Sequence, residues 1–210
     1  MRGLFIVLEG PEGAGKSTLA RRLAERLAER AAAAEIVLTR EPGGTPVSDA
    51  IRSVLLDPGL EVDALTEFLL YSASRAQHVA DVIRPALERG AIVICDRFYG
   101  SSVAYQGAGR GLPADFVAGL NDTVVGDCRP DATVLLDIDS SVGLERIRLR
   151  GQTDRLERAD LAFHERVAQS FRQQAATGGW LTVDAARPQD EVEHQVLAGL
   201  EGVIGTWLQD

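Results

Sequence analysis

The stretch Gly10-Pro11-Glu12-Gly13-Ala14-Gly15-Lys16-Ser17 decides the fold, because it follows an apolar run at Leu4–Leu8 and opens a helical pattern at Thr18–Arg30. It fits the phosphate-binding loop G-x-x-x-x-G-K-[ST] at every fixed position. In such a loop the backbone N–H groups surround the phosphates, the lysine reaches the β- and γ-phosphate oxygens, and the serine hydroxyl binds Mg²⁺. The N-terminus of the helix adds partial positive charge near the phosphates. The loop together with Thr18, the first residue of the predicted helix, therefore predicts a nucleoside triphosphate site at residues 10–18.

Lys16 is the only lysine among 22 Lys and Arg residues, which leaves 21 arginines. A lysine offers a compact point charge on a flexible stem, which suits a loop wrapped closely around a polyphosphate. A composition rich in Arg and Ala can also leave one lysine by chance, so this scarcity supports the motif without proving it. The loop alone is compatible with ATPases, GTPases and small-molecule kinases.

The bulk composition is that of one globular domain over residues 1–210, with 45% hydrophobic and 25% charged residues. A formal net charge of −9 argues against a general binder of nucleic acid or of anionic membranes. No run approaches the roughly 20 apolar residues of a membrane span, and the first strand begins too early for a signal peptide. We therefore expect a cytoplasmic protein without a nucleic-acid or membrane partner, in which Cys95 and Cys128 do not form a disulfide.

Short apolar runs alternate with helical patterns along the chain. Buried parallel strands are predicted at Leu4–Leu8, Ile36–Thr39, Ala91–Cys95 and Thr133–Leu136, with a weaker fifth at Trp180–Val183. Helices are expected at Thr18–Arg30, Val47–Leu56, Ala64–Arg89 with a kink at Pro85, Ala114–Val125, Ser141–Arg150, Asp160–Ala176 and Asp190–Trp207. This alternation predicts an α/β protein with the three-layer P-loop NTPase fold, whose five-stranded parallel sheet carries helices on both faces and binds ligands beyond the carboxyl ends of its strands.

Two further polar segments point to phosphate chemistry. Asp96 and Arg97 follow a predicted strand, where Asp96 is placed to hold Mg²⁺ directly or through water and Arg97 to grip a phosphate. Taken alone, Asp96 and Arg97 could equally well form an ordinary ion pair at the protein surface. The arginine-rich segment 146–158 is broken by Gly151, as a hinged lid over a transferring phosphoryl group would be. Without the phosphate-binding loop, an exposed charged helix would be the better interpretation of this segment.

Two polar runs also follow predicted strands, at Arg40–Thr45 and Ser101–Gln106. A second ligand could bind at either, and a structural turn or a helix cap is the competing explanation. The histidines are isolated on helical segments, and we interpret them as surface or packing residues rather than catalysts: His78, His164 and His194.

The ordered combination of these segments resembles the thymidylate kinase family, whose members phosphorylate dTMP. The likeness is carried by Leu8–Ser17, by Thr39–Thr45, by Asp96–Phe98 with Ser101–Ser102 and Ala104–Gly107, and by Asp154–Glu157. Arg129–Asp131 and Val183–Ala185 also fit. The resemblance covers essentially the full length. Gly13 and the arginine-rich segment are similar to the bacterial type, in which the catalytic arginines sit in the lid and not in the phosphate-binding loop.

The resemblance implies how the acceptor nucleoside would be held. Glu12 would hydrogen-bond the deoxyribose 3′-hydroxyl, and Tyr105 would crowd the ribose 2′ position. Tyr71, where many relatives have Phe, would stack on thymine, and Arg75 would donate to thymine O4. Contacts to the base edge would come from Ser102 and Gln106.

The resemblance also implies how the phosphates would be held. Arg97 and Arg52 would bind the dTMP phosphate, with Arg40 as a helper. Arg150 and Arg155 are the lid candidates for the transferring phosphate, so the predicted catalytic set is Lys16, Arg97, Arg150 and Arg155. Ser17 and Asp96 are the predicted metal residues.

The function that the resemblance implies is transfer of the γ-phosphate of ATP to dTMP, with Mg²⁺, which supplies dTDP for dTTP synthesis. The resemblance also implies a homodimer. Two alternatives stay open: a kinase for another nucleoside monophosphate or a deoxynucleoside, and a nucleotide-gated switch that phosphorylates no acceptor. The acceptor phosphate is already a dianion at neutral pH, so the reaction requires no strong general base.

Overall fold

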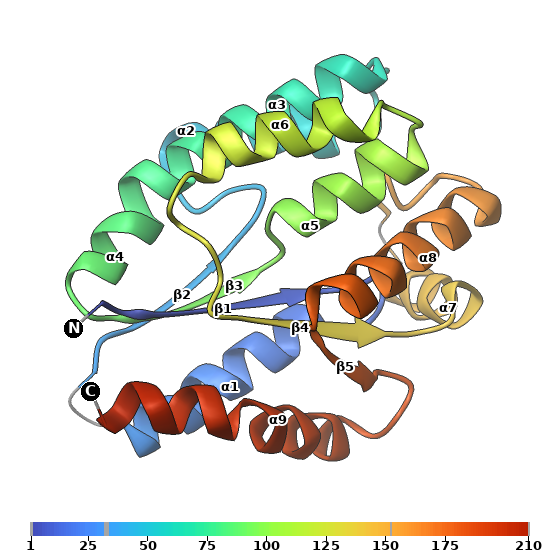
Figure 1. Ribbon diagram of the computed structural model, residues 1–210. Coiled ribbons are helices and arrows are strands. Elements are labelled where there is room, and N and C mark those ends of the chain that lie inside the picture. The colour runs from blue at the N-terminus through green and yellow to red at the C-terminus, as the bar shows by residue number, and fades with distance from the viewer. Residues whose placement is uncertain (1, 32–33, 152, 210) are drawn as a thin grey trace.

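The computed structural model describes residues 2–31, 34–151 and 153–209. Five parallel strands form one sheet in the order β2-β3-β1-β4-β5 (Figure 1). The strands are β1 (Leu4–Glu9), β2 (Ile36–Arg40), β3 (Ile92–Asp96), β4 (Ala132–Asp137) and β5 (Leu181–Asp184). The predicted α/β class and the five-stranded parallel sheet are confirmed.

Each strand extends one residue beyond its predicted carboxyl end, to a polar residue that still pairs with its neighbour strand. These residues are Glu9, Arg40, Asp96, Asp137 and Asp184. An apolar run ends at its last apolar residue, whereas the hydrogen-bonded ladder continues one residue further. The parallel register places the polar ends together: Leu8 pairs with Asp96, and Asp96 pairs with Arg40.

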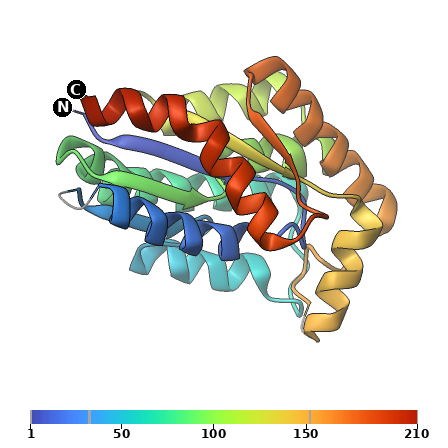
Figure 2. The ribbon, with the colours of Figure 1, turned by 90° about the horizontal axis from the view of Figure 1, so that it is seen from below.

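Two layers of helices cover the sheet because successive residues of each strand face opposite sides. Leu4, Ile6 and Leu8 of β1 face α1 (Lys16–Arg30) and α9 (Gln189–Gln209). Phe5 and Val7 face the opposite layer, which includes the π-helical segment η1 (Val79–Ile83) and α4 (Arg84–Glu88). Figure 2 shows α1 and α9 lying across one face of the sheet.

The other helices stand over the second face and at the carboxyl edge of the sheet (Figure 1). They are α2 (Pro46–Leu56), α3 (Ala64–His78), α5 (Tyr99–Ser102), α6 (Ala114–Val125), α7 (Ser140–Arg150) and α8 (Leu161–Gly178). Four begin with a side-chain oxygen that accepts from a backbone N–H of the first turn, from Thr45, Asp63, Asp139 and Asp160. These caps explain the sharp starts of helices that carry site residues.

Two helical features differ from the sequence expectation. The long helix predicted at Ala64–Arg89 is interrupted by η1, immediately before Pro85, where Arg84 N–H donates to Val79 C=O. Proline lacks an N–H and its ring clashes with the preceding turn, and a π-turn relieves that conflict without ending the helix. The second feature is α5 with the π-helical segment η2 (Val103–Gly109), since no helix was predicted over the polar run Ser101–Gln106.

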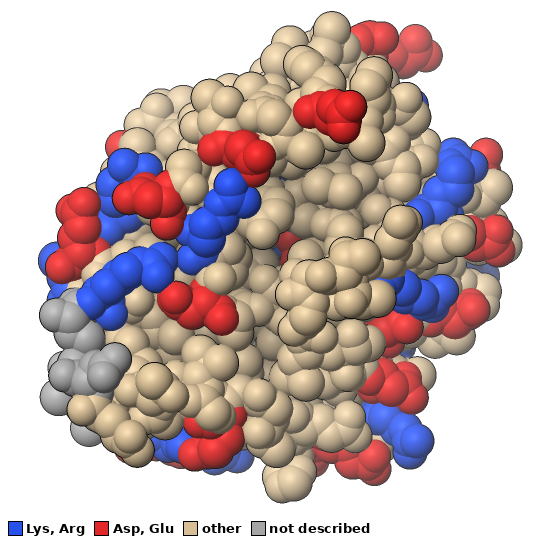
Figure 3. Space-filling view, in the orientation of Figure 1, with Lys and Arg blue, Asp and Glu red and all other residues tan. Residues whose placement is uncertain are grey.

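The surface shown in Figure 3 carries acidic and basic side chains in mixed order around its rim, with a largely uncharged middle. Within the described ranges, no helix is both long enough and apolar enough to cross a membrane. Cys95 and Cys128 are buried and both are free thiols, in agreement with the expectation for these residues.

Candidate active site

The phosphate-binding loop connects β1 to α1 and approaches α7 closely. Gly13 has φ +73°, and a Cβ at this position would lie 2.2 Å from the Gly143 carbonyl oxygen. Only glycine fits both constraints. The loop therefore touches the helix from which the arginine-rich segment continues.

Lys16 lies at the centre of the loop with its side chain folded back. Its Nζ donates to Gly10 C=O at 3.0 Å and to Pro11 C=O at 2.8 Å. Burial, reinforced by the charge of Arg97 and opposed by Glu12 and Asp96, lowers the pKa of Lys16 to about 8. The ammonium is thus held by neutral carbonyls, which leaves its charge available for an anion.

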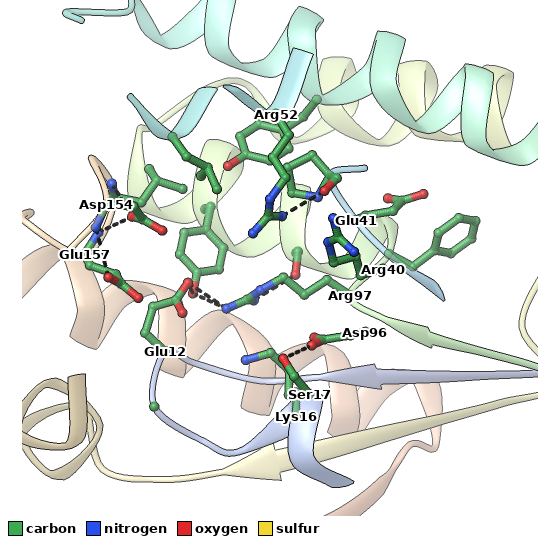
Figure 4. A pocket seen from close by; sticks show the side chains of 18 of the residues that line it. Glu12, Lys16, Ser17, Arg40, Glu41, Arg52, Asp96, Arg97, Asp154 and Glu157 are labelled. Carbon is green, nitrogen blue, oxygen red and sulfur yellow. Dashed lines mark hydrogen bonds and ion pairs between the residues drawn. The ribbon is translucent and has the colours of Figure 1, made fainter. Parts of the chain in front are cut away.

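Ser17 and Asp96 meet at the junction of α1 and β3. The Ser17 hydroxyl donates to Asp96 Oδ2, and Figure 4 shows this pair beside Lys16. Both predicted metal residues therefore lie together, at the strand end next to the loop.

Arg97 extends across the middle of the site. Its backbone has φ +72°, an uncommon conformation for a side chain with a Cβ, and its N–H donates to Leu8 C=O. The guanidinium donates to Gly10 C=O at 3.0 Å and to Ser101 Oγ at 3.1 Å. Figure 4 shows this side chain between Lys16 and Arg52. A strained backbone at such a point is typical of functional sites.

Glu12 and Tyr105 complete the Arg97 environment. Glu12 Oε1 accepts from Arg97 Nη2 at 2.6 Å and from the Tyr105 hydroxyl at 2.9 Å, and the Arg97 guanidinium lies over the Tyr105 ring. Burial alone would raise the pKa of Glu12, but Arg97, Lys16 and the Tyr105 hydroxyl together lower it to about 2. Glu12 is therefore an ionised hydrogen-bond acceptor that faces the cavity.

Glu9 supports this arrangement from below, and sequence reasoning did not single it out. Its carboxylate accepts from Phe98 N–H and Ser101 N–H, both at 3.0 Å, and from the Ser101 hydroxyl at 2.6 Å. Burial outweighs these hydrogen bonds and raises the pKa of Glu9 to about 6. A charged residue at the end of an otherwise apolar strand was the available signal.

A cavity of about 570 Å³ brings most predicted site residues together. On the phosphate side it is lined by Glu12, Gly13, Gly15, Lys16, Ser17, Thr18, Asp96 and Arg97. The rest of the lining includes Arg40, Arg52, Tyr71, Arg75, Ser102, Tyr105, Gln106 and Arg150. Gly10, Pro11 and Ala14 belong to the loop but do not line this cavity.

Arg75 lies at the back of the cavity and is only 1% exposed. It donates to Glu41 at 2.7 Å, to Asn121 at 2.8 Å and to Ser102 Oγ at 3.0 Å. Glu41 also contacts His78, whose ring reaches Thr39 Oγ1, so this histidine is a buried packing residue. The predicted contact between Arg75 and a thymine oxygen stays a prediction.

Arg52 and Arg40 enter the cavity from the side opposite Lys16 (Figure 4). Arg40 pairs with Asp49, but within the described chain no carboxylate pairs with Arg52, which donates to Pro42 C=O at 2.8 Å. Burial, reinforced by the charge of Arg40, lowers the pKa of Arg52. An uncompensated guanidinium in a cavity favours binding of an anion.

The two lid candidates are placed differently. Arg150 lines the cavity and pairs with Glu157 at 2.5 Å. Arg155 does not line the cavity: its guanidinium contacts Glu67 at 2.6 Å and Leu55 C=O at 3.0 Å behind the wall. The buried Glu67 carboxylate thus pairs with Arg155 in this structure, and the predicted contact between Arg155 and the transferring phosphate stays a prediction.

A second cavity of about 520 Å³ lies on the other side of the phosphate-binding loop, against the β5–α9 connection. Ala14 and Thr18 line it, and so do Arg146 and Arg187. Arg146 donates to Gly13 C=O and Ala185 C=O, which fixes its guanidinium beside the loop.

A divalent cation fits the Ser17–Asp96 corner only in the company of phosphate. In the part of the chain that the structure describes, no three His, Cys, Asp or Glu residues form a cluster able to hold a metal alone. Mg²⁺ in nucleotide enzymes is held by one or two protein oxygens together with substrate phosphates and water. A hydroxyl and a buried carboxylate beside Lys16 match that pattern.

A phosphate-binding loop faces, across one cavity, an arginine that no described carboxylate pairs with, and this arrangement fits a nucleotide-dependent phosphotransferase. Comparisons with known proteins specify the class further. The thymidylate kinase family model matches residues 8–196. The chain belongs to the thymidylate kinase family.

The relatives match over nearly the whole chain. Thymidylate kinase of Deinococcus radiodurans is 54% identical over 201 residues, which are 95% of this chain and 97% of the relative. A thymidylate kinase of Pseudomonas fluorescens is 55% identical over 199 residues, 93% of this chain and 94% of the relative. A crystal structure of thymidylate kinase from Ehrlichia chaffeensis aligns with a TM-score of 0.78 at 33% identity, covering 96% of this chain and 99% of that one.

Proposed function

We propose that this protein transfers the γ-phosphate of ATP to dTMP, giving dTDP and ADP. The observation that carries the proposal is the cavity that holds Lys16 of the phosphate-binding loop and the uncompensated Arg52 on opposite sides, with Arg97 between them. Donor and acceptor phosphates would meet at Arg97. Membership of the thymidylate kinase family supports dTMP as the acceptor.

The protein would act by positioning and by stabilising charge. Lys16 would leave the loop carbonyls for the donor phosphate oxygens, while Arg52 and Arg97 would hold the acceptor phosphate in line. Glu12, ionised and facing the cavity, would accept from the sugar 3′-hydroxyl. An acceptor phosphate is a dianion at neutral pH, so none of these residues has to remove a proton from it.

Mg²⁺ would be held by the Ser17 hydroxyl and, directly or through water, by Asp96. When bound, the ion neutralises negative charge on the donor phosphates. The short contact between Ser17 and Asp96 keeps both oxygens at the strand end before any ligand arrives.

Residues 146–158 would form the lid, of which residue 152 lies outside the described ranges. Arg150 lines the cavity, and we propose that it leaves Glu157 for the phosphate in transfer. Arg155 would instead anchor the lid to α3 through Glu67. The cavity beside Arg146 would receive the adenine base, because it adjoins the loop on the side away from the acceptor.

The acceptor base would stack on Tyr71 and be contacted along its edge by Arg75, Ser102 and Gln106. Burial first, and Glu67 next, raise the pKa of Tyr71, so the phenol stays neutral and offers an apolar ring face. The Tyr105 ring is 3% exposed and would block a ribose 2′-hydroxyl.

An ADP-release assay across dTMP, dUMP, dCMP, dGMP and AMP tests the proposal. We expect the highest kcat/KM with dTMP. Preference for another nucleotide would support the alternative kinase, and ATP binding without phosphorylation of any acceptor would support a nucleotide switch.

We propose that two copies of the chain form a homodimer through α2, α3 and α6. Five large apolar side chains are exposed on these helices: Val47, Val54, Leu65, Leu69 and Phe116. A patch of this kind favours a self-complementary interface. Leu69→Glu is expected to shift the sedimentation coefficient to that of a monomer, and an unchanged value would contradict this interface.

The two free thiols fit a reducing compartment, and we propose that the enzyme acts in the cytoplasm.

A further inference from the structure

Glu67 of α3 is a fully buried carboxylate outside the predicted site, and it connects three parts of the molecule. Its exposure is 0%. Oε1 accepts from Gln106 Nε2 at 2.9 Å and from Arg110 Nε at 3.3 Å, and Oε2 accepts from Arg110 Nη2 at 3.1 Å and from Arg155 Nη1 at 2.6 Å. The partners come from η2 and from the lid segment. Two guanidiniums on one oxygen keep the carboxylate in a fixed orientation.

This contact decides which end of the Gln106 amide faces the cavity. A carboxylate only accepts hydrogen bonds, so the amide must turn its NH₂ group toward Glu67. Gln106 lines the cavity, and none of the described residues donates to its carbonyl oxygen Oε1. That oxygen is not among the enclosed atoms that lack a partner within the described chain. Gln106 therefore presents an acceptor to the cavity.

We infer that Glu67 is a positioning residue for base selection: it orients the Gln106 amide so that the pocket accepts a pyrimidine whose N3 carries a hydrogen. Thymine and uracil donate from N3–H, whereas cytosine N3 is an acceptor and would meet the Gln106 oxygen with like polarity. Glu67 touches no substrate and acts through Gln106. The inference rests on the proposed function, since it specifies the acceptor base of that site.

The isosteric change Glu67→Gln tests the orientation. The new amide has one oxygen and one NH₂ group. In the place of Oε2 the NH₂ would meet two close donors, Arg110 Nη2 and Arg155 Nη1, whereas in the place of Oε1 it meets one guanidinium nitrogen, the more distant Arg110 Nε at 3.3 Å. The NH₂ is therefore expected to face Gln106, whose own amide then turns over and presents NH₂ to the cavity. We expect the ratio of dTMP to dCMP affinity to fall about tenfold or more, the usual consequence of a mismatched buried hydrogen bond.

A compensating change provides the sharper test. Gln106→Glu alone places two carboxylates against each other and should also weaken dTMP binding. In the double variant Glu67→Gln, Gln106→Glu the donor and the acceptor have exchanged places, and an oxygen again faces the base. The double variant should recover most of the dTMP preference lost in Glu67→Gln, which a purely structural role would not produce.

The matched control is Glu193→Gln on α9, because Glu193 is 5% exposed and also pairs with two arginines, Arg22 and Arg26. Base preference should be unchanged in this variant. Binding of dTMP, dUMP and dCMP is measured by calorimetry, with circular dichroism as the check on folding. An unchanged dTMP to dCMP ratio in Glu67→Gln, or no recovery in the double variant, would overturn the inference.

One measurement on the wild-type chain is independent of variant folding. In the free protein, the Gln106 side-chain amide proton that is donated to Glu67 should exchange slowly in NMR spectra. Rapid exchange of this proton would place the NH₂ group in the cavity and overturn the inference. Failure of the wild-type protein to phosphorylate dTMP would instead contradict the proposed function. The NMR and binding measurements do not require turnover, so they test the role of Glu67 separately.

Discussion

Arg97 Nη2 lies 2.6 Å from Glu12 Oε1, and this ion pair joins the end of β3 to the phosphate-binding loop across the centre of the cavity. Neither side chain is free to move alone, because Arg97 also donates to Gly10 C=O and Glu12 also accepts from Tyr105. The two phosphate-handling sides of the site are thus fixed to each other before a ligand binds. Such preorganisation lowers the activation barrier of phosphoryl transfer in a kinase that forms no covalent intermediate with its substrate.

Stability and activity should separate at Arg97, because its backbone is left-handed. Arg97→Ala and Arg97→Gly should each lower kcat at least about 100-fold through loss of a guanidinium at the transferring phosphate. Gly adopts a positive φ without strain, so Arg97→Gly should unfold with a free energy about 1 kcal/mol higher than Arg97→Ala. Urea denaturation measures the difference, and equal stabilities would show that this φ is not strained in solution.

The hydroxyl and the ring of Tyr105 should have different roles. The ring packs against Phe163 and Phe171, so Tyr105→Phe keeps its bulk in place. Preference for dTMP over its ribonucleotide should survive, while kcat/KM falls about tenfold from loss of the hydrogen bonds to Glu12 and Arg97. Loss of the sugar preference in this variant would assign discrimination to the hydroxyl.

Glu9 should make the free energy of unfolding depend on pH between about 4.5 and 6. Its pKa rises from 4.5 to about 6 on folding, so between these values the folded chain binds more protons than the unfolded chain. The free energy of unfolding due to this group therefore falls as the pH rises from 4.5 to 6. Glu12, with its pKa lowered to about 2, acts below pH 4.5 and in the opposite direction.

Glu9→Gln removes this titration. Denaturant unfolding of wild type and variant at pH 4.5, 5.5 and 6.5 should show the wild type losing stability relative to Glu9→Gln across the series. A constant difference would mean that Glu9 keeps an ordinary pKa in the folded protein.

The sequence predicted the elements of the fold because apolar runs and the phosphate-binding loop are local signals. The site residues that directly follow the strands could be found from the same pattern, because the carboxyl ends of parallel strands meet at one edge of the sheet. Glu67 could not, because a glutamate in an amphipathic helix is normally exposed and nothing local shows that Gln106 and Arg155 converge on it. The same non-local contact, the pair between Arg155 and Glu67, could not be predicted either, because Arg155 was considered only for a contact with the phosphate.

The two lid arginines should therefore give different kinetic signatures. Arg150→Ala should lower kcat about 1000-fold, the range known for arginines that contact a transferring phosphoryl group, with little change in the KM for dTMP. Arg155→Ala should act mainly on KM, because it releases the lid from Glu67 and Leu55. Steady-state kinetics of both variants decides this, and a larger fall in kcat for Arg155→Ala would restore it as the catalytic arginine.

Lys16 should take up a proton when nucleotide binds at alkaline pH. Its pKa of about 8 reflects burial among neutral carbonyls, and donor phosphates would favour the charged form and raise that pKa. Binding of MgATP should be accompanied by proton uptake at pH 8.5 and by almost none at pH 6.5. Calorimetry in buffers of different ionisation enthalpy measures this quantity. Lys16→Gln, which should also lower kcat by orders of magnitude while dTMP still binds, should show no uptake at either pH, and uptake that persists in this variant would assign the titration to another group.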